Sequence, residues 1–278
     1  MVVKITTLIE NDVKDKSVLN NEHGLSFYIQ VDDINIIFDT GQSGKFIENA
    51  NKLNIDLKQT NYVVLSHGHY DHSGGFTRLV KEIGNSFELI TGEKFFNCKY
   101  KCDGIYYKYI GNNFEKKYLK DSKISAKYIN QDIFNISDNI QVFSNFERKT
   151  GFEKVNNKFY IKVDNNYETD DFSDEIVLTI QLKEGLLVIL GCSHIGVVNI
   201  LETLIQRTGM PIYGIIGGTH LVEADDLRLN ETINYLKEKD IKLIGVSHCT
   251  GEKAIEKLKY EFKDKFLNVT TGQTIEIC

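Results

Sequence analysis

The feature that most constrains this sequence is a run of three histidines and one aspartate within six residues. The run directly follows residues 62–66, which have the composition of a short buried strand. Packing four such side chains together without a cation would cost desolvation energy and return no stabilisation. Imidazole and carboxylate groups are ordinary ligands of zinc and similar ions. The run therefore predicts a metal site in a loop at a strand end, made by His67, His69, Asp71 and His72.

Other residues that can bind a metal also follow predicted strands. These are Asp39, His194, His220 and His248, each placed just after a strand-like segment and next to glycine, serine or threonine. Sites in α/β proteins gather at strand ends, because rigid strands hold the converging loops there. Taken singly, each of these residues can equally be structural. Their shared placement indicates that they belong to one functional site.

Strand-like and helix-like segments alternate in the first and last thirds of the chain. The predicted strands are 3–9, 26–31, 34–38, 62–66, 176–182, 186–190, 212–216, 243–246 and 274–277, with amphipathic helices between several of them. Residues 98–169 are less regular and rich in tyrosine, lysine and asparagine. We expect them to form a β-rich insertion that shapes the substrate site. The pattern predicts one layered α/β domain over residues 1–278, with this irregular insertion at about 98–169.

Composition excludes several classes of protein. Hydrophobic residues make up 41% and charged residues 26%, as in an ordinary globular chain. The net charge is −6 and no basic stripe is present, so we expect no nucleic-acid partner. Five cysteines without a signal-peptide pattern argue against a secreted disulfide framework. No apolar run approaches the length of a membrane span. We therefore expect a cytoplasmic protein that does not associate with membranes.

The segment His67-Gly68-His69-Tyr70-Asp71-His72 resembles the His-x-His-x-Asp-His motif of the metallo-β-lactamase superfamily. Other segments resemble one branch of it, which holds metal-dependent hydrolases and the archaeal dihydropterin ribofuranosylaminobenzene 5'-phosphate synthase. They lie at residues 23–26, 38–41, 191–194, 217–221 and 248–251. The resemblance runs from about residue 5 to 277 and is weakest between 98 and 169. It implies an α/β fold of four layers, the αβ/βα sandwich, with metals at one edge between two sheets.

The resemblance also implies two divalent metal ions. It implies that His67, His69 and a later histidine, for which we choose His194, bind the first ion. It implies that Asp71, His72 and His248 bind the second ion. We expect zinc, with manganese or iron as alternatives.

One position departs from the superfamily's pattern. An aspartate that bridges the two metals usually follows a glycine at the end of a late strand, and here Cys192 stands in its place. A thiolate there would favour zinc over magnesium or manganese. The alternative is a buried thiol that binds nothing and leaves the second metal weaker. His220 can be a ligand, a contact to an anionic substrate group, or a support for a ligand, and Asp39 can contact metal or substrate. We interpret Asp171, Asp174 and Glu175 as a solvated acidic turn, with the alternative that one of them orients a ligand.

The implied activity is that of a metallohydrolase. A metal ion lowers the pKa of bound water and supplies hydroxide at neutral pH, and Asp71 can pass the proton to the leaving group. The expected substrate is a small molecule with an ester-like or phosphoester bond, with phosphorylated compounds preferred. Alternatives are a carbon–nitrogen bond-forming synthase acting on a pterin and a phosphoribosyl compound, and a non-catalytic binding protein of the same fold. A flavin-coupled reductase would need an attached flavin domain.

Overall fold

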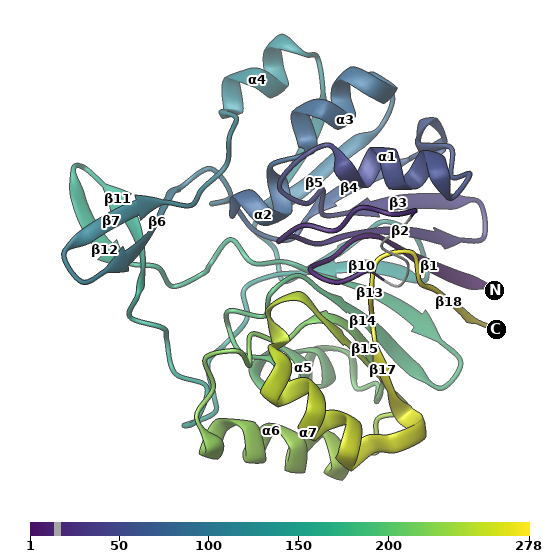
Figure 1. Ribbon diagram of the computed structural model, residues 1–278, viewed down its shortest axis with the longest axis vertical. Helices are drawn as coiled ribbons and strands as arrows, with labels where there is room; N and C mark the ends of the chain where they lie inside the picture. The colour runs from purple at the N-terminus through teal and green to yellow at the C-terminus, as the bar shows by residue number, and fades with distance from the viewer. Residues whose placement is uncertain (14–17) are drawn as a thin grey trace. The chain divides into compact units, whose positions relative to one another are not determined.

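The computed structural model describes residues 1–13 and 18–278 (Figure 1). The chain forms two compact units whose segments alternate along the sequence. The first unit comprises residues 1–129, 157–170 and 270–278, and the second comprises residues 130–156 and 171–269. Within the described residues, no helix is both long enough and apolar enough to cross a membrane.

The first unit is built on a seven-stranded sheet in the order β18-β1-β2-β3-β4-β5-β8. Its strands are β1 (Val3–Ile9), β2 (Ser26–Val31), β3 (Ile34–Phe38), β4 (Tyr62–Leu65), β5 (Glu88–Gly92), β8 (Ser125–Ile129) and β18 (Thr274–Ile277). Strands β18, β1, β2 and β3 pair antiparallel, whereas β3, β4, β5 and β8 are parallel. Parallel neighbours end at the same edge of a sheet. The loops that follow β3 and β4 therefore begin side by side.

Helices cover one face of this sheet (Figure 1). They are α1 (Lys45–Lys52), α2 (Tyr70–Ser73), α3 (Phe76–Ile83) and α4 (Lys116–Asp121), with a short 3-10 helix η1 (Leu57–Gln59). The apolar face of α1 is buried, and its Phe46 and Ala50 join the core together with Phe76 and Leu79 of α3. Residues that recur three and four positions apart place these side chains on one stripe of each helix. Gly84 ends α3 with a φ of +78°, a backbone conformation that glycine adopts without steric cost.

A smaller four-stranded sheet also belongs to the first unit, in the order β12-β11-β6-β7 (Figure 1, left). Its strands are β6 (Cys98–Asp103), β7 (Tyr106–Tyr109), β11 (Phe159–Val163) and β12 (Asn166–Thr169). Residues 98–169 are thus more regular than we expected, and they also supply strands to both large sheets. Tyrosine rings make contacts between neighbouring strands, as between Tyr100 of β6 and Tyr109 of β7, which lie opposite each other with ring centroids 5.4 Å apart. Such cross-strand pairs stabilise a sheet although lysine and asparagine weaken its sequence pattern.

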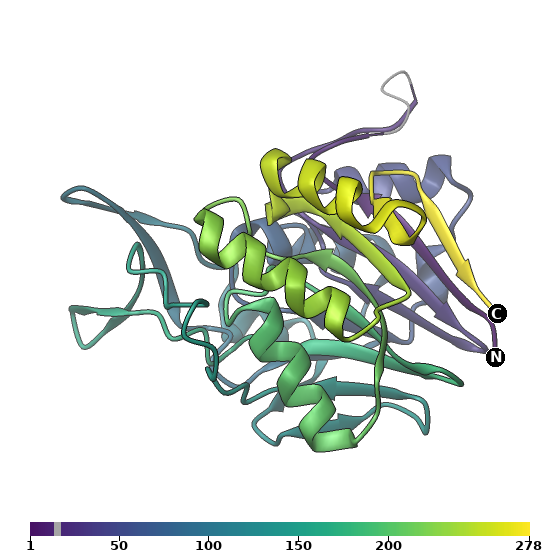
Figure 2. The same ribbon diagram turned by 90° about the horizontal axis from the view of Figure 1, so that it is seen from below.

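The second unit is built on another seven-stranded sheet, in the order β17-β16-β15-β14-β13-β10-β9. Its strands are β9 (Ile133–Asn135), β10 (Ile140–Phe143), β13 (Val177–Leu182), β14 (Gly185–Leu190), β15 (Ile212–Gly218), β16 (Leu243–Ser247) and β17 (Phe266–Asn268). Strands β14 to β17 are parallel. The helices α5 (Val197–Thr208), α6 (Asp226–Glu238) and α7 (Glu252–Phe262) lie side by side (Figure 2). The 3-10 helices η2 (His248–Thr250) and η3 (Lys263–Lys265) flank α7. The loops after β14, β15 and β16 therefore share one edge of the sheet.

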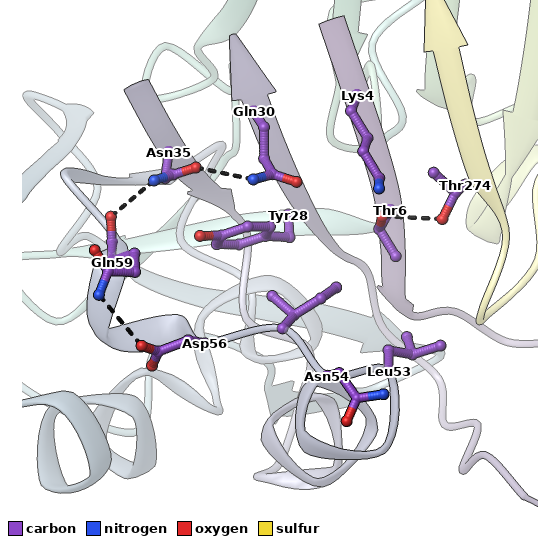
Figure 3. A pocket seen from close by; sticks show the side chains of 11 residues that line it. Lys4, Thr6, Tyr28, Gln30, Asn35, Leu53, Asn54, Asp56, Gln59 and Thr274 are labelled. Carbon is purple, nitrogen blue, oxygen red and sulfur yellow. Dashed lines mark hydrogen bonds between the residues drawn. The ribbon is translucent and has the colours of Figure 1, made fainter. Parts of the chain in front are cut away.

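A polar depression of about 290 Å³ opens on the first unit beside β1, β2 and the segment after α1 (Figure 3). The amides that line it bond to one another: Gln30 donates to Asn35 at 3.3 Å, and Asn35 donates to the carbonyl of Gln59 at 3.1 Å. Burial, together with the charge of Asp56, raises the pKa of Tyr28 in this depression to about 12. None of the metal-binding candidates from the sequence lines this depression.

Candidate metal centre

The first unit brings His67, His69, Asp71 and His72 together in the loop after β4. The ring centroids of His67 lie 4.6 Å from His69 and 4.3 Å from His72. The Nε2 atom of His67 is 3.0 Å from Nδ1 of His69, and Asp71 Oδ2 is 3.9 Å from Nε2 of His72. All four side chains are buried. The loop thus gathers three imidazoles and a carboxylate, the group types that hold zinc.

Asp39 supports this ligand loop from the end of β3. Its Oδ2 atom accepts hydrogen bonds from Nδ1 of His72 at 2.6 Å and from the hydroxyl of Ser66 at 2.8 Å. Its Oδ1 atom accepts the Ser66 N–H at 2.7 Å. The bond at Nδ1 orients the imidazole of His72 so that Nε2 is the nitrogen nearer Asp71. A carboxylate that fixes the far nitrogen of a histidine is the usual partner of a metal-binding imidazole.

Burial keeps His67 of the ligand loop uncharged. The pKa of His67 lies well below its usual value, because burial disfavours the charged ring and the neighbouring His72 and His69 add to the effect. His67 is therefore neutral near pH 7. The neutral imidazole is the form that coordinates a metal ion.

Two strands of the four-stranded sheet, β6 and β11, carry side chains that contact this loop. The Phe159 ring stacks on His69 with centroids 5.6 Å apart. Lys99 and Asp170 form a buried ion pair with Nζ and Oδ2 2.7 Å apart. A Cβ atom added to Gly68 would lie 3.3 Å from Cε of Lys99. The segment that we expected to shape the site therefore supports the ligand loop through β6 and β11.

Sequence reasoning missed Glu22, which stands just before the exposed His23. The buried carboxylate of Glu22 accepts the N–H groups of Gln42 and Ser43 at 3.1 and 3.0 Å and the Ser43 hydroxyl at 2.5 Å. It thereby holds the loop after β3. His23 itself places Nε2 3.1 Å from Oδ2 of Asp71. A single glutamate in a loop carries no sequence signal that separates this role from a solvated one.

The second unit brings Cys192, His194, His220 and His248 together after β14, β15 and β16. The Sγ atom of Cys192 lies within 4.8 Å of a ring nitrogen of His194 and within 4.8 Å of one of His248. The rings of His194 and His220 meet nearly at right angles, with centroids 4.3 Å apart. All four side chains are buried. Adjacent parallel strands that end together explain this grouping, as the strand-end placement predicts.

Three residues of these loops adopt left-handed backbone conformations although none is glycine. The φ angles of Ser193, His220 and His248 are +61°, +46° and +54°. Such residues persist where the surroundings over-determine them, and they cluster at functional sites. Cys249 contributes to this support, because its Sγ accepts the His220 N–H at 3.3 Å and donates to the Cys192 carbonyl at 3.4 Å. The chain therefore places the two imidazoles at a local conformational cost.

The acidic turn before β13 is not solvated, contrary to our interpretation of Asp174 and Glu175. These residues are only 1% and 2% exposed, while Asp171 is exposed. Glu175 accepts the N–H groups of His194 and Ile195, each at 2.9 Å. Burial raises the pKa of the Glu175 carboxyl to about 7, against the opposing effect of these two hydrogen bonds. The structure agrees instead with the alternative interpretation, that one of the three acidic residues supports a ligand. That residue is Glu175, which bonds to the backbone of the candidate ligand His194.

Comparison with known proteins gives the family. Residues 19–96 match the family model of the metallo-beta-lactamase superfamily. The 7,8-dihydropterin-6-methyl-4-(beta-D-ribofuranosyl)-aminobenzene-5'-phosphate synthase of Methanocaldococcus jannaschii is 31% identical, over 99% of this chain and 96% of its own length. The chain belongs to the metallo-β-lactamase superfamily. The resemblance found in the sequence is thereby confirmed.

Further comparisons agree with this assignment. An uncharacterized protein of the same archaeon is 30% identical over 91% of this chain and 93% of its own length. The crystal structure of Tm1679, a metal-dependent hydrolase of the beta-lactamase superfamily, has a TM-score of 0.86 at 29% identity, covering 99% of both chains. A diphosphatase of the PhnP family has a TM-score of 0.58 at 14% identity, which shows the fold alone. The predicted fold class is confirmed. The fold is metal-dependent, and this chain carries histidine, aspartate and cysteine side chains that are candidate ligands.

Proposed function

We propose that the protein is a metal-dependent hydrolase that cleaves an ester-like or phosphoester bond of a small molecule. The observation that carries this proposal is that each unit holds its own buried set of metal-binding side chains at strand ends. Buried imidazoles beside a carboxylate or a thiol gain little stability unless a cation joins them. Nitrogen, oxygen and sulfur donors together suit zinc, with manganese or iron as alternatives. These candidate ligands therefore suit the metal ions on which the superfamily depends.

We assign two ions to these side chains. The ligands are His67, His69 and His194 for the first ion and Asp71, His72 and His248 for the second. At the position where the superfamily usually has an aspartate, Cys192 either supplies a thiolate or stays a buried thiol that binds no metal. His220 serves either as a further ligand or as a contact to an anionic group of the substrate. Asp39 orients His72, as its hydrogen bond to Nδ1 supports.

The chain's own residues would contribute to hydrolysis in two ways. Bound metal ions of this kind lower the pKa of coordinated water, so that hydroxide is available near pH 7. The chain keeps the imidazole of His67 buried and neutral, as its lowered pKa indicates. The carboxylate of Asp71, next to Nε2 of His23, takes the proton of the attacking water and returns it to the leaving group. The name of the M. jannaschii relative refers to a 5'-phosphate, which favours a phosphorylated substrate.

Metal analysis and hydrolysis assays test this proposal. Protein purified without chelator or nickel is expected to contain about two zinc ions per chain and to hydrolyse p-nitrophenyl esters or phosphodiesters, lactones or thioesters. The substitution His69→Ala removes a ligand and should lower both the metal content and kcat/KM, the latter by about 100-fold or more. The surface change Lys117→Ala is the control. Full metal content and full activity in the His69→Ala variant would refute the proposal.

A synthase is the second candidate, because the 31% identity extends over almost the whole of both chains. This alternative predicts carbon–nitrogen bond formation between a pterin and a phosphoribosyl compound. Mass spectrometry of the two substrates incubated with metal-loaded protein would detect the product. Product formation without hydrolysis of any ester would replace our proposal, whereas hydrolysis without product would exclude the synthase.

A further inference from the structure

Two charged side chains, the buried Glu175 and the half-buried Arg148, hold the backbone of His194. Glu175 accepts the N–H groups of His194 and Ile195 at 2.9 Å each. The Arg148 guanidinium donates to the carbonyl of Ile195 at 2.8 Å and to that of His194 at 3.4 Å. The polar groups of two consecutive residues are thus bonded to one carboxylate and one guanidinium.

Phe172 fixes the ring of His194. The two rings are parallel within 7°, with centroids 4.1 Å apart, and Phe172 is only 1% exposed. Its φ of +55° is unusual for a bulky residue, and such a conformation persists only where neighbours enforce it. The Glu175 N–H donates to the Phe172 carbonyl at 3.0 Å, and Arg148 reaches the Asp171 carbonyl at 3.4 Å. Arg148, Phe172 and Glu175 are therefore tied to one another, and we call them the His194 clamp.

Stability alone does not explain the His194 clamp. Burying the carboxylate of Glu175 and half-burying the guanidinium of Arg148 both carry a desolvation penalty, and apolar residues of similar size often serve a fold as well or better. What the clamp does instead is set the backbone and the ring plane of a single imidazole. That imidazole places a nitrogen within 4.8 Å of the Cys192 sulfur. A ligand that is already oriented loses less conformational freedom when it binds an ion, which raises the affinity.

We propose that Arg148, Phe172 and Glu175 are positioning residues that orient His194 for metal binding. The proposal rests on the proposed function, because it requires His194 to be a ligand. According to this proposal, the His194 clamp controls two properties, the metal affinity and the coordination geometry at His194. Neither property follows from a purely structural role of these three residues.

The chain offers a matched control in Glu153. Like Glu175, Glu153 is 2% exposed and its carboxylate accepts two consecutive backbone N–H groups, those of Val198 at 2.9 Å and Asn199 at 2.7 Å. These N–H groups belong to the first turn of α5 and not to a candidate ligand. Changing either glutamate to glutamine removes the charge and replaces one acceptor oxygen by an NH2 group. One of the two backbone N–H groups then faces another donor and loses its hydrogen bond. Both variants should therefore lose similar stability in urea, whereas only one should change the metal site.

The test compares zinc affinity and the visible spectrum of the cobalt-substituted full-length protein in Glu175→Gln, Phe172→Leu, Glu153→Gln and His194→Ala. We expect Glu175→Gln and Phe172→Leu to weaken zinc binding about 10- to 100-fold and to shift the cobalt bands. Glu153→Gln should leave both unchanged. Phe172→Leu keeps the test decisive if Glu175→Gln fails to fold.

Three results would overturn the inference. One is wild-type zinc affinity and spectrum in both clamp variants, and another is an equal loss in Glu175→Gln and Glu153→Gln. The third is unchanged affinity in His194→Ala, which would show that His194 is not a ligand while leaving a metal-dependent hydrolase intact. Failure of the wild-type protein to bind any metal would instead refute the proposed function on which the clamp depends.

Discussion

Gly68 separates His67 from His69, and a side chain at this position would collide with a neighbouring carbonyl. A Cβ atom there would lie 2.3 Å from the carbonyl oxygen of Phe95, which also accepts a hydrogen bond from Asn112 at 2.8 Å. Gly68→Ala should therefore displace the ligand loop. We expect the free energy of unfolding to fall by about 1–3 kcal/mol, as for other overpacked sites, and zinc binding to weaken. Urea denaturation and zinc titration measure the two effects.

A second glycine provides the control for this substitution. A Cβ atom on Gly151 would meet nothing within 4 Å. Gly151→Ala should change the free energy of unfolding by less than about 0.5 kcal/mol and should leave zinc binding as it is. Wild-type stability and zinc affinity in Gly68→Ala would show that the loop adjusts without moving its histidines, and would contradict the steric explanation.

At the scale of elements, the loop after β3 depends on Glu22. Its carboxylate accepts three hydrogen bonds from Gln42 and Ser43, and in Glu22→Gln the side-chain amide would face one of these donors with an N–H group of its own. We expect this substitution to lower the free energy of unfolding by about 1.5–3 kcal/mol. Glu48→Gln is the control, because Glu48 is exposed and its hydrogen bond with Asn20, at 2.9 Å, lies at the surface. Equal urea midpoints for the two variants would exclude a role for Glu22 in holding this loop.

The elements that sequence could predict are those with strong local patterns. The predicted strands 3–9, 26–31 and 34–38 coincide with β1, β2 and β3, because β-branched and aromatic residues concentrate there. The insertion at 98–169 was predicted to be β-rich, but its individual strands were not, because contacts such as that of Tyr100 with Tyr109 stabilise them from the neighbouring strand. The candidate ligand histidines could be found from their place at strand ends. The role of Glu175 could not be predicted from the sequence, because its partner His194 is 19 positions away and only the fold brings the two residues together.

At the scale of the whole molecule, Tyr28 should make stability depend on alkaline pH. Tyr28 is 3% exposed and its pKa is raised to about 12 by burial and the charge of Asp56, whereas an unfolded tyrosine titrates near pH 10. The folded state therefore disfavours the phenolate. The stability that the neutral phenol confers is complete below about pH 10 and is lost as the pH rises from there through about 12.

Tyr28→Phe removes this titration while keeping the ring in the core. Urea denaturation of both proteins between about pH 9 and pH 11.5 should show the stability of the wild type falling relative to that of the variant as the pH rises. The other tyrosines are present in both proteins, so their effects cancel in the difference. Tyr106→Phe is the control, because that ring is 75% exposed, and its difference from the wild type should stay constant. If the stability difference between the wild type and Tyr28→Phe also stayed constant with pH, the explanation would be wrong. The Tyr28 phenolate would then be solvated in the folded protein to the same extent as in the unfolded chain.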